Sequence, residues 1–306
     1  MPSCKGFAAL DARSALAPYN FSRREPGPTE IAVEILFCGV CHTDLHMSRN
    51  EWGQSMPCVR GEEHFCDEGP TLTYASPDRV DGSITMGGYA NNYTVDERFA
   101  HTVPANLDLA AVAPLLCAGI TTYSPLRHWK AGPGKKVGIV GLGGLGHMAL
   151  KFAHSFGAHV VQFTTSLKKK NDALRLGANE VVLSTDADAM KGHTKSFDFI
   201  LDTVSGPHAL EDYLALLKQD ATMTLVGLPE TPPSVSVFSL ITKRAAIAGS
   251  MIGGMPETQE MLNYCGAHNI VSEVEVIPIQ KVNEAFERLL KQDVKYRFVI
   301  DMSSLG

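Results

Sequence analysis

Hydrophobic and polar positions follow two different patterns along the chain. Before residue 134, short alternating runs predict strands at 31–37, 90–95 and 100–103, and a longer apolar run predicts a helix over 110–123. From Lys135 onward, apolar runs alternate with amphipathic stretches. The predicted strands are 136–141, 159–165, 180–183, 197–203, 222–227 and 245–250, and the predicted helices are 145–156, 168–176, 208–218 and 257–265. This alternation is typical of an α/β fold with a parallel, doubly wound sheet.

The last residues follow a third arrangement. VEVIPI, VNEAFERLLK and YRFVID predict a strand, a helix and a strand that return to the first part of the chain instead of forming a third unit. We therefore expect one domain made of residues 1–121 and 270–306, and a second domain made of residues 122–269.

The most informative motif is a glycine-rich turn between a predicted strand and a predicted helix. Gly141, Gly143 and Gly146 form G-x-G-x-x-G within VGIVGLGGLGHMALKFAHSFG. The first glycine permits the tight turn, the second lets the backbone approach a pyrophosphate, and the third allows close helix–strand packing. A plain glycine-rich turn is the alternative, but the flanking elements favour a dinucleotide. The candidate pyrophosphate loop is Gly141, Leu142, Gly143, Gly144, Leu145 and Gly146.

The segment after the second predicted strand indicates which dinucleotide binds. NAD-binding units carry an acidic residue about 20 residues beyond the glycines. Here the segment reads TTSLKKK over 164–170, with no carboxylate before Asp172. Hydroxyl and ammonium groups bind a 2′-phosphate, which an acid would repel. A solvated basic turn is the alternative, but Thr164, Thr165, Ser166 and Lys169 favour NADP.

Composition excludes several classes of partner. The 306 residues are 44% hydrophobic and 20% charged, which suits a globular protein with two domains. A net charge of −6 makes nucleic acid and anionic membranes poor partners. No apolar run is long enough to span a bilayer, and the first residues lack a signal-peptide pattern, so we expect a cytoplasmic protein. Seven cysteines without an export signal favour metal binding or free thiols over disulfides.

A second motif, CHTDLH at 41–46, places a thiol, a hydroxyl, a carboxyl group and two imidazoles just after a predicted strand. Cys41 could bind zinc, which prefers thiolate and imidazole ligands, and Asp44 could orient a ligand. Thr43 and His46 could pass a proton to solvent. Thr43 and Asp44 could equally be caps of a following helix, so the spacing alone leaves the metal open.

Three long segments resemble the zinc-dependent medium-chain alcohol dehydrogenases. They are GVCHTDLH, GGYANNYTVDE and PLLCAGITTYSPLRHWKAGPGKKVGIVGLGGLGHMALKFA, and the resemblance runs over nearly the whole chain. It is strongest to the branch of NADP-dependent aldehyde reductases similar to cinnamyl alcohol dehydrogenase. The resemblance implies a GroES-like β-rich catalytic domain, a Rossmann domain, and reversible hydride transfer between NADP(H) and a primary alcohol or aldehyde. It also implies a homodimer formed through edge strands of the Rossmann sheet.

The resemblance assigns roles to single residues. Cys41 and Cys117 match two thiolate ligands of the catalytic zinc, and Thr43 and His46 match the proton relay. The remaining cofactor-binding candidates are His42, Thr121, Thr203, Gly227, Ser250, Met251 and Ile252. Cys58 and Cys66 have the spacing of two cysteines in the structural-zinc lobe of this family. Trp52 could line the substrate pocket or be an ordinary packed aromatic residue.

The chain departs from the family pattern near Met56 and Pro57. The G-H-E segment that supplies a histidine ligand is absent, as are the first two cysteines of the lobe, so we expect a shortfall of roughly 40 to 50 residues. Two thiolates do not complete a catalytic zinc site, which needs three protein ligands. Glu62, Glu63 or His64 could stand in. Either the deletion is genuine or the 306 residues leave out a stretch that the protein has, and retention of Cys41 and Cys117 favours the second explanation.

Together these features predict an NADP-dependent zinc alcohol dehydrogenase acting on aromatic or aliphatic aldehydes. Zinc would polarise the carbonyl group, and the nicotinamide would deliver the hydride. The rival interpretation is a protein that binds NADP and turns nothing over, because the catalytic zinc site is incomplete. A zinc-free reductase of the quinone-oxidoreductase type is a weaker alternative, since Cys41 and Cys117 are both kept.

Overall fold

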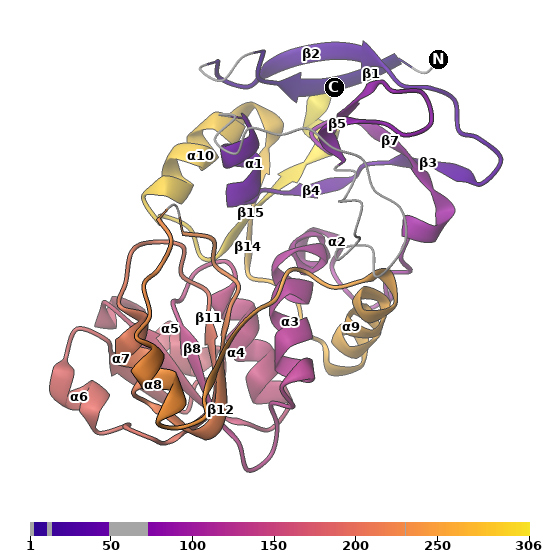
Figure 1. The fold of residues 1–306 in the computed structure, drawn as a ribbon. Helices are drawn as coiled ribbons and strands as arrows, with labels where there is room; N and C mark the ends of the chain where they lie inside the picture. The colour runs from indigo at the N-terminus through magenta and orange to yellow at the C-terminus, as the bar shows by residue number, and fades with distance from the viewer. Residues whose placement is uncertain (1–2, 11–13, 49–72, 230) are drawn as a thin grey trace. The chain divides into compact units, whose positions relative to one another are not determined.

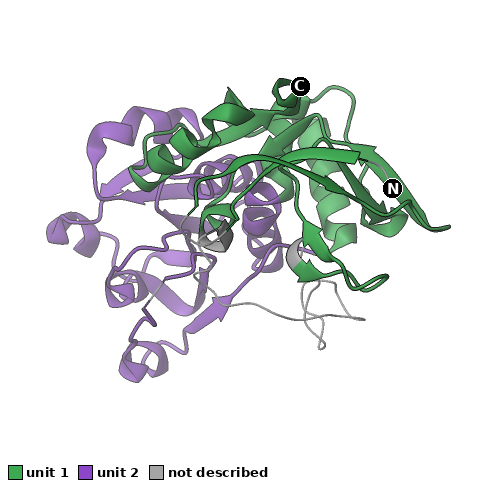
Figure 2. Ribbon diagram, turned by 90° about the horizontal axis from the view of Figure 1, so that it is seen from above, with its two compact units in different colours: residues 1–116, 254–306 green, residues 117–253 purple. Residues whose placement is uncertain are grey.

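The computed structural model describes residues 3–10, 14–48, 73–229 and 231–306. The chain forms two compact units, which Figure 2 colours separately. Unit 1 comprises Met1–Leu116 and Gly254–Gly306, and unit 2 comprises Cys117–Gly253. The sequence pattern placed these limits at 122 and 270, so the residues of helix α9 (Met255–His268) fall in unit 1 and not with the dinucleotide-binding pattern.

Unit 2 is built around a six-stranded parallel sheet with the strand order β10-β9-β8-β11-β12-β13. The strands are β8 (Lys136–Val140), β9 (His159–Thr164), β10 (Glu180–Leu183), β11 (Phe197–Asp202), β12 (Leu217–Leu225) and β13 (Ala246–Gly249). The central strands are apolar and buried along most of their length, as expected for a sheet covered on both faces. The strand order reverses between β8 and β11, which is where such sheets bind dinucleotides.

Helices cover both faces of this sheet, and Figure 1 shows α3 and α4 on one side of it and α7 and α8 on the other. They are α3 (Ala118–His128), α4 (Gly146–Ser155), α5 (Lys170–Arg175), α6 (Ala187–Lys191), α7 (Leu210–Leu214) and α8 (Val237–Ile241). On the α7 side, Leu210, Tyr213 and Leu214 pack in one buried cluster with Val161 and Phe163. On the α3 side, the Tyr123 ring packs edge-on against Phe152, with centroids 5.3 Å apart. The sheet is therefore doubly wound, and the predicted fold class is confirmed.

Unit 1 is made of small sheets and short helices. Its strand pairs are β1 (Ser3–Ala8) with β2 (Ala17–Ser22), β3 (Glu30–Glu34) with β7 (Asn92–Asp96), and β5 (Tyr74–Pro77) with β6 (Ile84–Met86). A three-stranded sheet joins β14 (Val274–Pro278), β15 (Arg297–Asp301) and β4 (Phe37–Gly39). Its helices include α1 (His42–Ser48), α2 (Leu109–Val112) and α10 (Val282–Leu290). Because β15 pairs with β4, the end of the chain returns to its first part.

Several predicted elements differ from the structure, among them the strand expected at 31–37, which is divided into β3 and β4, and three others. Residues 100–103 were expected as a strand, but in this described stretch they form none. The Gln259 side chain takes both backbone groups of Thr102: its oxygen accepts from the Thr102 N–H at 2.8 Å, and its amide donates to the Thr102 carbonyl at 2.9 Å. These backbone groups are thereby satisfied by a side chain and need no neighbouring strand.

The other two differences are element boundaries. The helix expected over 110–123 is divided into α2, a 3₁₀ turn (Ala113–Leu116) and α3, because Cys117 leaves the helical conformation at φ −131°. The helix expected over 208–218 ends at Leu214, because Leu217 already pairs with Phe197 as the first residue of β12. In the second case a partner strand decides where the helix stops.

Among the described residues, no single helix is long and apolar enough to cross a membrane. The bent pair Leu109–Leu116 and Ala118–His128 passes the same test of length and composition only when the two are taken together.

Candidate cofactor site and catalytic residues

The glycine-rich loop in unit 2 has the geometry of a pyrophosphate-binding turn. Gly141 follows β8 at φ +88°, a conformation that glycine adopts without strain. A Cβ atom at Gly146 would lie 2.1 Å from the Gly141 carbonyl oxygen, so the first turn of α4 can approach the loop only with glycine there. A Cβ atom at Gly143 would meet nothing within 4 Å. The first and third glycines are thus required by packing, while the second faces open space where a phosphate could lie.

The residues that follow β11 and β12 lie close to this loop. The Thr203 hydroxyl donates to the Val140 carbonyl oxygen at 2.7 Å. A Cβ atom at Gly141 would lie 2.8 Å from Val204 Cγ2, and one at Gly227 would lie 2.3 Å from the Val204 carbonyl oxygen. The structure therefore brings Thr203 and Gly227 to the same sheet edge as the glycine loop, at the point where the strand order reverses.

The segment expected to hold the 2′-phosphate lies at the carboxyl end of β9. The Thr164 hydroxyl donates to the Ser166 carbonyl at 3.1 Å, and the Ser166 hydroxyl accepts from the Lys168 N–H at 3.3 Å, capping a 3₁₀ turn (Leu167–Lys169). The Lys169 ammonium donates to the Leu142 carbonyl at 3.2 Å. A cation is thereby held at the glycine loop, on the side where an adenosine ribose would lie.

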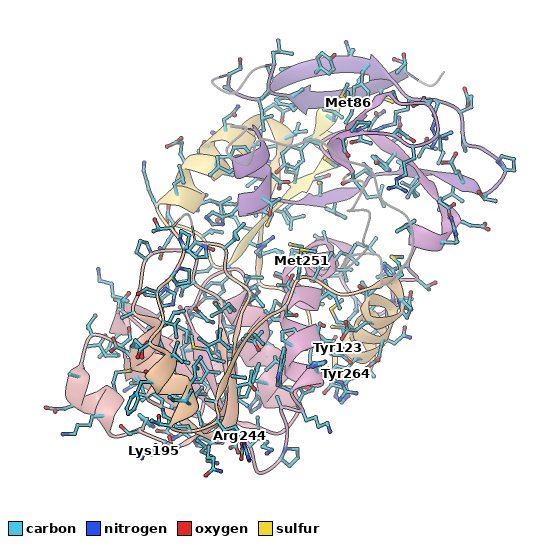
Figure 3. All side chains as sticks on the ribbon, in the orientation of Figure 1. Met86, Tyr123, Lys195, Arg244, Met251 and Tyr264 are labelled. Carbon is cyan, nitrogen blue, oxygen red and sulfur yellow. The ribbon has the colours of Figure 1, made fainter. Side chains whose placement is uncertain are left out.

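The other predicted cofactor residues differ in exposure. Met251, labelled in Figure 3, is 48% exposed, and Ile252 is 40% exposed with φ +41°. The Ser250 N–H donates to the Leu225 carbonyl at 3.3 Å, which ties the start of this run to β12. Thr121 is buried in α3, and its N–H donates to the Cys117 carbonyl at 3.0 Å.

Sequence reasoning missed an ion pair at the end of β11. Asp202 is 2% exposed, and its Oδ2 lies 2.9 Å from His208 Nε2. Its Oδ1 accepts from the Val204 N–H at 3.0 Å. The carboxylate raises the pKa of His208, because it stabilises the charged ring. The available signal was the position of Asp202, an acidic residue that ends a buried strand at the binding edge of the sheet.

In unit 1, Cys41 lies immediately before α1 and is held by Asp44. The Asp44 carboxylate accepts from the Cys41 N–H at 2.7 Å and from the Tyr89 hydroxyl at 3.0 Å. Burial raises the pKa of Asp44 to about 6. The Cys41 thiol donates to the Thr43 hydroxyl over 3.7 Å, which places the first member of the predicted relay beside the predicted ligand. Tyr89 lies in GGYANNYTVDE, and the sequence pattern predicted no role for it.

The other predicted residues of this region are described only in part. His42 is exposed at the start of α1, and His46 is described only as part of that helix. Trp52, Cys58, Glu62, Glu63, His64 and Cys66 lie outside the described residues. The role assigned to each of them therefore stays a prediction.

The fit of a zinc ion is only partial. Cys41 and Cys117 are half-buried and form no disulfide, so both offer the thiolate chemistry that zinc prefers. Cys41 belongs to unit 1, and Cys117 is the first residue of unit 2. Within the part of the chain that the structure describes, no group of three or more His, Cys, Asp or Glu side chains could hold a metal. A third protein ligand would have to come from elsewhere.

Comparisons with known proteins agree on one family. Residues 144–267 match the family model described as zinc-binding dehydrogenase. The chain is 51% identical to the aldehyde reductase YahK of Escherichia coli, covering 98% of this chain and 99% of that protein.

Two solved structures resemble the fold over almost its full length. The cinnamyl alcohol dehydrogenase SbCAD4 from Sorghum bicolor matches with a TM-score of 0.91 and 39% identity, covering 99% of this chain and 98% of that one. CAD from Helicobacter pylori, complexed with NADP(H), matches with a TM-score of 0.89 and 36% identity, covering 98% of each chain.

The match to the Escherichia coli reductase also shows how many residues this chain lacks. The match to the Escherichia coli reductase extends over 345 residues, whereas this chain has 306. At least 39 positions of that relative therefore have no counterpart here. This agrees with the internal gap expected from the sequence.

Proposed function

Because the chain belongs to the zinc-binding dehydrogenase family, we propose that it is an NADP(H)-dependent alcohol dehydrogenase that interconverts aldehydes and primary alcohols. The observation that carries the cofactor assignment is the basic turn after β9. Lys169 is fixed on the Leu142 carbonyl, Thr164 and Ser166 offer hydroxyl groups beside it, and no acidic residue lies between Thr164 and Asp172. A 2′-phosphate would gain charge-assisted hydrogen bonds from this turn.

The residues of unit 2 would bind and orient the cofactor. The open face of Gly143 leaves room for the pyrophosphate, and the N-terminus of α4 adds a partial positive charge there. Thr203 and Gly227, at the ends of β11 and β12, would lie along the nicotinamide half. The cofactor would thus lie across the point where the strand order reverses.

The residues of unit 1 would serve the substrate oxygen. Zinc, when bound, would polarise the aldehyde carbonyl as a Lewis acid. Cys41 and Cys117 would be two of its ligands, and the third would be the histidine of the stretch that the 306 residues leave out, with Glu62, Glu63 or His64 as stand-ins if the deletion is genuine. Thr43 and His46 would move the proton between the substrate oxygen and solvent. Asp44 would hold the Cys41 backbone in place.

We further propose aromatic and medium-length aliphatic aldehydes as substrates, and a homodimer as the assembly. The names of the relatives support the aldehyde class. The dimer is supported by the edge of the sheet in unit 2, where β13 has no outer neighbour among the described strands. Beyond β12, α8 exposes Val237, Phe238 and Ile241 at 67%, 70% and 67%. Exposed apolar side chains of this kind mark association surfaces.

The test is an assay of the purified protein with cinnamaldehyde, in which the zinc content is measured first. We expect NADPH oxidation, about one zinc ion per chain, and loss of turnover on chelation that added zinc restores. Equal rates with NADH would contradict the cofactor assignment. Activity that survives complete zinc removal would contradict the role of the metal. NADPH binding without turnover would instead favour a binding protein that lacks dehydrogenase activity.

A further inference from the structure

The loop between β11 and α7 contains a histidine with two hydrogen bonds to acceptors. His208 Nε2 lies 2.9 Å from Asp202 Oδ2, and its Nδ1 lies 2.9 Å from the Gly206 carbonyl oxygen. A carboxylate and a carbonyl oxygen can only accept hydrogen bonds, whereas a neutral imidazole carries a single N–H. Both bonds can exist together only when the His208 ring is an imidazolium ion.

The His208–Asp202 pair is hydrogen-bonded to the backbone of the loop between β11 and α7, which lies against the glycine turn. A Cβ atom at Gly141 would lie 2.8 Å from Val204 Cγ2. A Cβ atom at Gly227 would lie 2.3 Å from the Val204 carbonyl oxygen. The Ser205 hydroxyl accepts from the Leu228 N–H at 3.2 Å. Asp202 binds the start of this loop through the Val204 N–H, and His208 binds its middle through Gly206. The loop is thus fixed at both points by one ion pair.

The position of the loop identifies the part of the cofactor that it would contact. The glycine turn follows β8, and the 2′-phosphate turn follows β9, so the adenosine half lies over the first half of the sheet. The loop follows β11, the first strand on the other side of the point where the order reverses. In a doubly wound sheet that second half carries the other mononucleotide, which here is the nicotinamide.

We propose that protonated His208 is a positioning residue that fixes the β11–α7 loop beneath the nicotinamide half of NADP(H), which makes cofactor affinity dependent on pH. The proposal rests on NADP(H) being the cofactor, as argued above. Deprotonation removes one of the two N–H donors, releases either Asp202 or Gly206, and loosens the loop. Affinity for NADPH is therefore highest when the ring is charged and falls as the pH rises.

The groups around His208 favour its charged form, in agreement with an NADPH affinity that falls as the pH rises. Asp202 faces the ring from β11 and raises the pKa of His208 above its ordinary value of about 6.5. Tyr213 faces it from α7, with ring centroids 5.9 Å apart, and burial raises the pKa of its phenol, so it stays neutral. The Glu211 carboxylate, also on α7, accepts from the Ser236 N–H and the Ser239 hydroxyl instead. Affinity is therefore lost as the pH rises through this raised pKa, which lies above that of an ordinary histidine.

The experiment measures the Kd of two probes at several values between about pH 6 and 9. NADPH, followed by its nicotinamide fluorescence, reports the whole cofactor. Adenosine 2′,5′-bisphosphate reports only the adenosine half and corrects for titration of the 2′-phosphate. We expect the ratio of the NADPH Kd to the adenosine 2′,5′-bisphosphate Kd to rise about tenfold with pH in the unaltered protein. This change corresponds to one charge-assisted hydrogen bond.

The variants separate His208 from general effects of substitution. H208Q should bind NADPH about five- to tenfold more weakly at low pH and show a flat ratio, because the amide does not titrate. H128Q, which replaces an exposed histidine at the end of α3, should keep the unaltered profile. D202N should lower the pH at which the ratio changes, because the carboxylate no longer stabilises the imidazolium.

Two results would overturn the proposal in distinguishable ways. If both probes bind and the ratio has the same pH profile in the unaltered protein, H208Q and D202N, His208 does not position the loop, although the cofactor assignment stands. If neither probe binds the unaltered protein, the cofactor assignment fails and the role of His208 fails with it.

Discussion

The cofactor-binding edge of unit 2 and the Cys41 segment of unit 1 are built in different ways. At the cofactor-binding edge, the glycine loop, Thr203 and Gly227 are joined by short side-chain and backbone contacts at the ends of neighbouring strands. The Cys41 segment has local support from Asp44 and Tyr89, but its ligand set needs residues from distant segments. A shortfall of at least 39 positions relative to the Escherichia coli reductase can therefore leave the first complete while it interrupts the second.

The largest effect on cofactor affinity is expected from Gly146→Ala. Its Cβ atom would lie 2.1 Å from the Gly141 carbonyl oxygen, so either the loop or α4 must move. We expect a loss of about 3 kcal/mol in the free energy of unfolding and a weakening of NADPH binding by more than about a hundredfold. Denaturant unfolding and fluorescence titration measure the two quantities. Unchanged stability would contradict the close approach.

Gly143→Ala is the matched substitution in the loop just before α4. Its Cβ atom would meet nothing within 4 Å, so the free energy of unfolding should change by less than about 0.5 kcal/mol. The added methyl group would occupy the space assigned to the pyrophosphate and weaken NADPH binding about tenfold or more. Normal affinity in this variant, measured by the same titration, would place the phosphates elsewhere.

Lys169→Ala addresses the 2′-phosphate. Removing the ammonium group held on the Leu142 carbonyl should weaken NADPH binding about tenfold, the effect of one charge-assisted contact. Affinity for NADH, which lacks the 2′-phosphate, should change little. Calorimetric titration of both cofactors gives the ratio. Lys168→Ala, at an exposed neighbour on the same turn, is the control for the loss of one positive charge.

The smallest effect on cofactor affinity is expected from Cys41→Ser in unit 1. The NADPH Kd should stay within about twofold of the unaltered value, because the glycine loop and its supports all lie in unit 2. Zinc content and aldehyde reduction should both fall, because serine is a poor zinc ligand. A large loss of NADPH affinity in this variant would mean that the two regions are coupled.

The two regions also differ in how well the sequence predicted them. The strand–turn–helix at 136–155 follows from local pattern, because the positive φ of Gly141 belongs to its own backbone and Gly146 meets Gly141 nearby in the chain. The strand expected at 100–103 failed because Gln259, more than 150 residues away, takes the backbone groups of Thr102. His208 was missed for a different reason: it lies close to Asp202 in the chain, but the pattern does not show that the loop turns its ring back onto that carboxylate. Local chemistry is visible in a sequence, and tertiary partners are not.

The most direct test of this account is the affinity of the metal-free protein for NADPH and NADH, measured by calorimetry. If unit 2 forms a complete NADP(H) site independently of the metal, NADPH should bind at least about thirtyfold more tightly than NADH, and added zinc should leave both affinities unchanged. Equal affinity for the two cofactors, or NADPH binding that requires zinc, would contradict the account.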